Sequence, residues 1–149
     1  MRYFDLELPV YTTNVLAQVK EQELNNNELR DFAIDVAIET TSRRSLNAAK
    51  IVDGGICHGM AGAAHIYNRL FLDTGEKSFL KASDFWTQQL LSRIKTDGGI
   101  KNFTEYNSID QRYVSAKGFL IGGLGAGLAL ISILDRSIQP NWDEFLLLS

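Results

Sequence analysis

Two stretches of the chain carry hydrophobic residues at the spacing of an amphipathic helix. The first covers residues 28–43, and its apolar positions are Leu29, Phe32, Ala33, Val36 and Ala37. The second covers residues 77–94, and its apolar positions are Phe79, Ala82, Trp86, Leu90 and Ile94. We therefore predict two helices that each bury one face and leave the other face in water.

Two further stretches are strongly apolar and begin at groups of glycines. The motif G-x-x-x-G-x-x-G-A occurs at residues 55–63 and again at residues 118–126, an offset of 63 residues. Two copies of one helix indicate a repeat architecture, in which each unit buries its apolar face against its neighbour. We predict that these helices form an inner layer and that the amphipathic helices shield it.

Weaker patterns predict the remaining elements. Residues 12–22 indicate a weak helix, and the asparagines at 25–27 are suited to cap the start of the helix that follows. Residues 96–115 have turn chemistry and no helical period. We predict a long loop there, with room for a short hairpin, on the face where the glycine turns lie.

The second apolar stretch, residues 118–134, also has a composition that a membrane helix could have. It is close to the minimum length of about 17 to 20 residues, and its G-x-x-x-G spacings would suit a dimer interface. The first copy, however, carries His65, Asn68 and Arg69 and is too polar for a bilayer. We therefore predict no membrane span and an equivalent, protein-buried place for both copies.

Composition and charge describe one globular domain over residues 1–149, with 45% hydrophobic and 22% charged residues. A net charge of −3 with scattered basic residues argues against a nucleic-acid partner. The single cysteine excludes an internal disulfide. Asp5 and Glu7 stand where a signal peptide would be basic and then apolar, so we expect a cytoplasmic protein.

That single cysteine, Cys57, stands next to His58 in the first glycine turn. The corresponding residues of the second copy are Leu120 and Ile121, so the scaffold does not require polar side chains here. Thiolate and neutral imidazole are ligands that zinc favours, and a glycine-bounded turn lets adjacent side chains converge on one ion. From spacing alone, the alternative is a lone buried cysteine beside a hydrogen-bonded histidine.

A zinc site normally needs three or four protein ligands. His65 lies about 10.5 Å of helical rise beyond His58, so we interpret it as a core or interface histidine bonded to a neighbour. The nearest carboxylates do not stand at a diagnostic spacing; they are Asp53, Asp97, Glu105 and Asp110. Adjacent residues are also poorly placed for a Cys-His nucleophile dyad.

Three motifs add a family resemblance. The segment "GICHGMAG" resembles the C-H-G-x-x-G signature of the lanthionine synthetase C-like (LanC) family. "GFLIGGLGAGLALISIL" followed by "NWDEFLLLS" is similar to that family's C-terminal glycine-rich helix and closing W-D-x-x-L-L-L pattern. The resemblance runs from about residue 27 to 149 and implies an all-α fold, a partial α/α toroid with inner and outer helix layers built from repeated helical hairpins.

The resemblance also implies a chemistry. Bacterial members are zinc-dependent cyclases that add a peptide cysteine thiol to a dehydrated serine or threonine in lantibiotic biosynthesis, and the motif makes Cys57 and His58 zinc ligands. The family's remaining zinc cysteine belongs to a W-C-Y-G-like turn, and the stretch expected to hold it, "LELPVYTTN", has none. Its acid/base histidine lies further upstream, beyond Met1. An incomplete zinc site follows.

Two functions are therefore predicted. The first is a C-terminal fragment of a LanC-like cyclase, inactive alone, that works with a peptide substrate or a biosynthetic partner protein. The second is a non-catalytic helical module that binds a peptide or a subunit. An incomplete ring exposes apolar helix faces, so we expect a homo-oligomer in either case.

Overall fold

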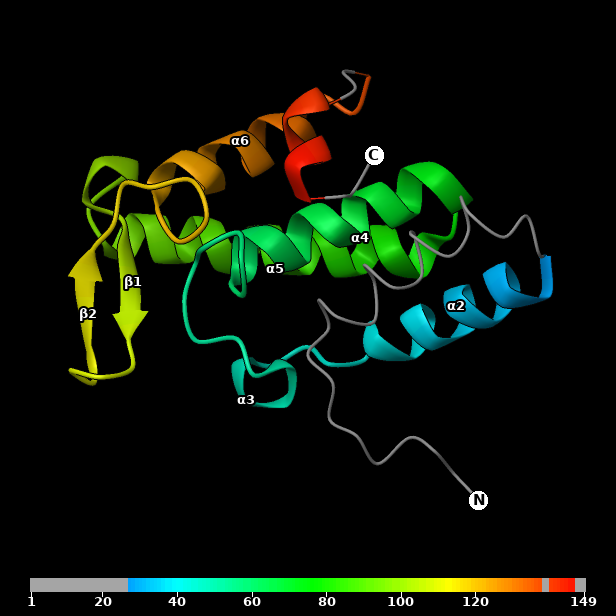
Figure 1. Cartoon of the computed structure of the whole chain (residues 1–149), viewed down its shortest axis with the longest axis horizontal. Helices are drawn as coiled ribbons and strands as arrows, with labels where there is room; N and C mark the ends of the chain where they lie inside the picture. The colour runs from blue at the N-terminus through cyan, green and yellow to red at the C-terminus, as the bar shows by residue number, and fades with distance from the viewer. Residues whose placement is uncertain (1–26, 138–139, 147–149) are drawn as a thin grey trace.

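The structure, a computed structural model, describes residues 27–137 and 140–146 (Figure 1). Its elements are α2 (Asn27–Thr40), α3 (Leu46–Ala49), α4 (Met60–Thr74), α5 (Lys77–Thr96), η1 (Ile100–Asn102), β1 (Thr104–Asn107), β2 (Arg112–Ser115), α6 (Gly123–Leu134) and η2 (Asn141–Leu146). The strands of this part of the chain form one two-stranded sheet, so the all-α prediction is confirmed. The helix expected at residues 12–22, and residues 25 and 26 of the capping run, lie outside the described residues.

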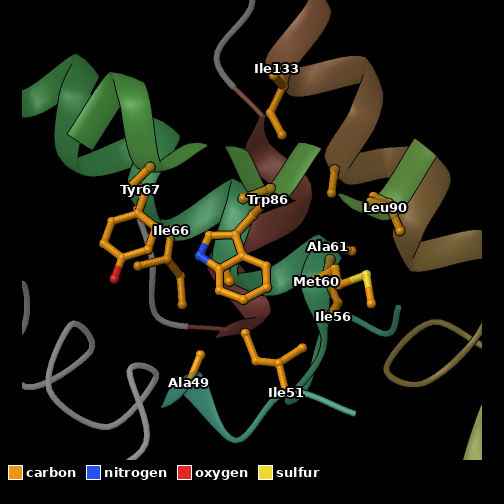
Figure 2. Packing of buried hydrophobic residues seen from close by; sticks show 14 of the residues in the cluster. Ala49, Ile51, Ile56, Met60, Ala61, Ile66, Tyr67, Trp86, Leu90 and Ile133 are labelled. Carbon is orange, nitrogen blue, oxygen red and sulfur yellow. The ribbon is translucent and has the colours of Figure 1, made fainter. Parts of the chain in front are cut away.

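Helix α4 is the centre of the fold. It packs mainly against α5 and α6, while α2 lies on the side opposite α6 (Figure 1). Side-chain hydrogen bonds add to this packing, since the Thr40 and Tyr67 hydroxyls lie 2.9 Å apart and the Ser83 hydroxyl donates to the carbonyl of Ala64 at 2.9 Å. Figure 2 shows Trp86 of α5 amid the core, next to Ile66 of α4.

The amphipathic pattern of α5 is confirmed. Phe79, Ala82, Trp86 and Leu90 are all buried, and the helix runs on to Thr96. Burying such a face contributes roughly 25 cal/mol for each Å² of apolar surface removed from water, and the aromatic rings remove the most. This face therefore holds α5 against α4.

The pattern of α2 is confirmed only in its second half. Ala37 and Thr40 are buried, but Phe32, expected on the buried face, is 56% exposed. The prediction for Phe32 is wrong because Ile34 and Ile38, on another side of α2, pack against the core instead. The helix also ends at Thr40 rather than residue 43, where the hydroxyls of Thr41 and Ser42 donate back to the carbonyls of Ile38 and Glu39.

The backbone of the glycine turns repeats as the motif predicts. Gly59 before α4 has φ −111° and ψ −171°, and Gly122 before α6 has φ −121° and ψ −175°. The first residue of each helix donates its N–H back to the carbonyl seven residues earlier, at 2.9 Å to Asp53 and at 3.1 Å to Ala116. The structural repeat therefore extends upstream of the motif, to residues 53 and 116.

Steric crowding explains why both turns keep their central glycine. A Cβ atom on Gly59 would overlap the backbone nitrogen of Gly55, and one on Gly122 would overlap the backbone nitrogen of Gly118 in the same way. Real Cβ atoms do not approach backbone atoms this closely, so the turn has to open for any other residue.

Helix α6 differs from its prediction in length and burial. Residues 118–122 form the turn, so the helix has 12 residues, Gly123–Leu134. One face is buried against α4, but Leu124, Ile131 and Leu134 are 58%, 59% and 83% exposed. The expectation of a place buried like that of α4 is therefore wrong for the outer face, which none of the described elements covers. Within residues 27–137 and 140–146, no helix has the length and apolarity to cross a bilayer.

The segment after α5 contains the hairpin that its turn chemistry allowed. Strands β1 and β2 are antiparallel, with Thr104 opposite Ser115 and Asn107 opposite Arg112. The hairpin lies at the end of the molecule where α4 and α6 begin (Figure 1). The hydroxyl of Tyr113 donates to the carbonyl of Val52 at 2.9 Å. The predicted location beside the glycine turns is thus confirmed.

Candidate functional site

Cys57 and His58 lie on the turn that precedes α4. Cys57 is exposed, and the His58 side chain is 53% exposed. The alternative of a buried cysteine is therefore wrong. The N–H groups of Ile56 and Cys57 both donate to the carbonyl of Leu120, each at 2.8 Å. Because Leu120 belongs to the second glycine turn, the two turns brace each other and fix the backbone that carries the pair.

A buried carboxylate lies behind this pair. The side chain of Asp53 is 1% exposed, and its Oδ2 lies 3.3 Å from Nε2 of His58. Oδ1 accepts the N–H of Gly55 at 3.0 Å, and Oδ2 accepts the N–H of Tyr106 of β1 at 3.5 Å. These donors offset the cost of taking the charge out of water. Asp53 therefore joins the turn, the hairpin and His58.

Local spacing gave no reason to single out Asp53. The repeat would have done so, because the position 63 residues later is Ala116. Asp53, Cys57 and His58 thus stand where the second turn has only apolar side chains. This contrast is visible in the sequence once the repeat is extended two residues upstream of its glycines.

The donors of the pair fit zinc, because thiolate and imidazole are among its preferred ligands. Across residues 27–137 and 140–146, however, no three His, Cys, Asp or Glu side chains come together in a way that could hold a metal ion. Asp53 is accordingly a partner of His58 rather than a third donor. A complete site needs further ligands from outside these residues, and the assignment of Cys57 and His58 as zinc ligands stays a prediction.

His65 lies apart from the pair, inside the core. Its Nε2 is 2.8 Å from Oδ2 of Asp143, and the same oxygen is 3.3 Å from Nε of Arg69. The ring of Trp142 lies 4.6 Å from that of His65, centroid to centroid. The interpretation of His65 as a core histidine hydrogen-bonded to a neighbour is confirmed. Its partner Asp143 was missed, although it is the aspartate of the closing "NWDEFLLLS" segment.

Two of the loop carboxylates, Asp97 and Asp110, have structural partners. Asp97 pairs with Arg93 at 3.2 Å and accepts the N–H of Thr104 at 3.0 Å, which ties the end of α5 to the hairpin. Asp110 lies 3.6 Å from Arg112 across the hairpin turn. Neither contact involves the Cys57–His58 pair.

Exposed apolar side chains border the pair. Leu120, whose carbonyl holds the first turn, is itself exposed, as is Ile121, whose Cα lies against Gly55. The corner thus combines two metal-capable side chains with an apolar margin.

Comparison with known proteins gives one family. The family model described as "Lanthionine synthetase C-like protein" matches residues 12–147, which is most of the chain and includes both glycine turns and η2. No curated protein gave a match.

Proposed function

The chain belongs to the lanthionine synthetase C-like family, and from that premise we propose that it is the C-terminal portion of a zinc-dependent cyclase of lantibiotic biosynthesis. In this proposal Cys57 and His58 are two of the zinc ligands. The substrate is a peptide that carries a cysteine thiol and a dehydrated serine or threonine, and the product is a thioether.

The contrast between the two glycine turns carries the proposal. Both turns have the same backbone angles and the same hydrogen bond back from the first helical residue. Leu120 and Ile121 satisfy the fold at the second turn, so folding alone does not account for Cys57 and His58 at the first. Both side chains are exposed, so neither contributes to the core, and an exposed thiol is open to oxidation. A purely structural role therefore explains the pair poorly.

The residues of the chain have defined parts in this chemistry. Zinc bound through a thiolate and an imidazole would favour the thiolate form of the substrate cysteine. Cys57 and His58 would hold the ion, and the rigid turn, braced by the carbonyl of Leu120, would fix its position. The exposed side chains of Leu120 and Ile121 would contact apolar residues of the peptide.

Zinc binding, rather than turnover, is the activity to test on this chain, because the described residues provide two ligands. The metal-free protein is titrated with zinc against a chromophoric chelator. We expect one zinc per Cys57–His58 pair, and a loss of affinity of about 100-fold or more in Cys57→Ala. Leu120→Ala, at the equivalent position of the second turn, is the matched control and should bind like the wild type. Undiminished binding by Cys57→Ala would refute the proposal.

The outer face of α6 favours a second candidate function, a non-catalytic module that binds another subunit. Leu124, Ile131 and Leu134 are all more than half exposed on one helix, and contiguous apolar surface of this kind marks interaction sites. Sedimentation velocity would give the mass in solution. We expect a dimer or larger species that Ile131→Asn weakens. A wild-type protein that stays monomeric at high concentration would contradict this candidate.

A further inference from the structure

We propose that Asp53 is the positioning residue of His58, which it holds in the tautomer with the proton on Nε2 so that Nδ1 is left for a metal ion. The part that concerns the metal rests on the proposed function. The part that concerns the tautomer does not, because it follows from the contact between the two side chains.

The position of the Asp53 carboxylate is fixed from two sides. The turn holds Oδ1 through the N–H of Gly55, and the hairpin reaches Oδ2 through the N–H of Tyr106. Only 1% of the Asp53 side chain is exposed, so it cannot turn away into solvent. The same Oδ2 lies 3.3 Å from Nε2 of His58. A fixed, buried carboxylate thus faces one defined nitrogen of a half-exposed imidazole.

The chemistry of the two groups selects the tautomer. An ionised carboxylate attracts an N–H group and repels a nitrogen lone pair, so an oxygen 3.3 Å from Nε2 favours the proton on that nitrogen. In a neutral imidazole the other nitrogen, Nδ1, then has the free lone pair. Within the part of the chain that the structure describes, Nδ1 has no hydrogen-bond partner. A carboxylate on the far nitrogen is also the usual way in which proteins orient a metal-binding histidine.

The second turn shows that the fold does not need this carboxylate. Ala116 takes the place of Asp53, and its carbonyl accepts the N–H of Gly123 just as that of Asp53 accepts the N–H of Met60. A methyl group is therefore enough for the turn itself. The carboxylate is present only in the copy that also has Cys57 and His58.

Nitrogen NMR can read the tautomer without any metal. The chain has two histidines, so ¹⁵N-histidine labelling gives two rings, and a His58→Asn variant assigns them. In metal-free protein near pH 7.5 we expect the Nε2–H form to dominate at His58. Asp53→Ala, which copies the second turn, should shift His58 measurably toward a mixture of tautomers. Asp110→Ala removes an equal charge from the hairpin and should change nothing.

Zinc titration of the same variants adds the second readout. Loss of a partner that orients a ligand typically lowers metal affinity by about 10- to 100-fold, so Asp53→Ala should weaken zinc binding by that factor. Asp53→Asn keeps the shape and replaces Asp53→Ala if the latter fails to fold. An unchanged tautomer ratio in the folded variant would overturn the proposal.

The two experiments separate this inference from the proposed function. If the tautomer responds to Asp53 but the wild type binds no zinc, the positioning role stands and the proposed function fails. If the wild type binds zinc and neither the tautomer nor the affinity responds to Asp53, the proposed function stands and the positioning role fails.

Discussion

Helices α4 and α6 begin at equivalent glycine turns, but α4 buries several polar side chains and α6 exposes several apolar ones. In α4 the polar residues His65, Asn68 and Arg69 are all buried. In α6 the apolar residues Ile131 and Leu134 are exposed, and Ile131 occupies the position that corresponds to Asn68. At these positions burial is therefore set by which elements surround the helix, and hydropathy alone gives the wrong answer there.

The polar residues of α4 are tolerated in the core because the C-terminal region supplies partners for them. Asp143 of η2 contacts His65 and Arg69, and Arg136, which follows α6, donates from Nε to Oδ1 of Asn68 at 2.8 Å. A buried polar group with a partner costs little, whereas one without a partner costs roughly 1 to 3 kcal/mol. The apolar outer face of α6 has no such covering segment among the described residues.

The sharpest way to break the comparison is to place a methyl group in both turns. Because a Cβ on Gly59 or Gly122 would overlap backbone atoms, we expect Gly59→Ala and Gly122→Ala each to lower the free energy of unfolding by about 3 kcal/mol or more. Urea unfolding followed by circular dichroism gives the loss. Gly127→Ala, where a Cβ meets nothing within 4 Å, should be neutral or stabilising by about 0.5 to 1 kcal/mol. Wild-type stability in either turn variant would show that the turns are built differently.

A second test removes the partner that lets α4 bury polar groups. Asp143→Ala leaves the buried ring of His65 without its carboxylate, and we expect a loss of about 2 to 3 kcal/mol in the free energy of unfolding. Glu144→Ala, at an exposed neighbour, should cost less than about 0.5 kcal/mol. His65→Leu introduces the residue that α6 has at the equivalent position, Leu128. The double variant Asp143→Ala with His65→Leu should lose less free energy of unfolding than the two single variants added together. Strict additivity would mean that the pair is not coupled.

The third test uses pH, because α4 has a titratable residue, Tyr67, at a position where α6 has none. Burial raises the pKa of Tyr67 from 10.0 to about 12, against the smaller opposing effect of its hydrogen bond with Thr40. The equivalent residue in α6 is Leu130. Since the pKa is higher in the folded than in the unfolded state, the neutral phenol stabilises the fold fully below pH 10, and this contribution is lost as pH rises through about 12.

The pH effect on stability should reach about 2 kcal/mol at most. Urea midpoints measured from pH 9 to pH 11.5 should fall more steeply for the wild type than for Tyr67→Phe, which has nothing to titrate at that site. Parallel slopes for the two proteins would contradict the assigned role of Tyr67.

Sequence patterns predicted what depends on local periodicity. The buried face of α5, the repeat at residues 55–63 and 118–126, and a hairpin after α5 all follow from spacing and turn chemistry. The partners of the two buried aspartates could not be predicted in this way. Asp53 contacts Tyr106 of the hairpin and Asp143 contacts His65 of α4. Spacing along the chain carries no information on which distant segments come together. The prediction for Phe32 was wrong for the same reason, since spacing did not show that Ile34 and Ile38 would face the core.

The measurement that bears most directly on the difference between the two turns is a cobalt(II) titration of the wild type and of Cys57→Leu combined with His58→Ile. This variant gives the first turn the side chains of the second. We expect the wild type to develop the absorption band of a thiolate bound to cobalt and the variant to show none. Their free energies of unfolding should agree within about 0.5 kcal/mol because both side chains are exposed. A wild type without the band, or a variant that retains it, would contradict the assignment of metal chemistry to the first turn.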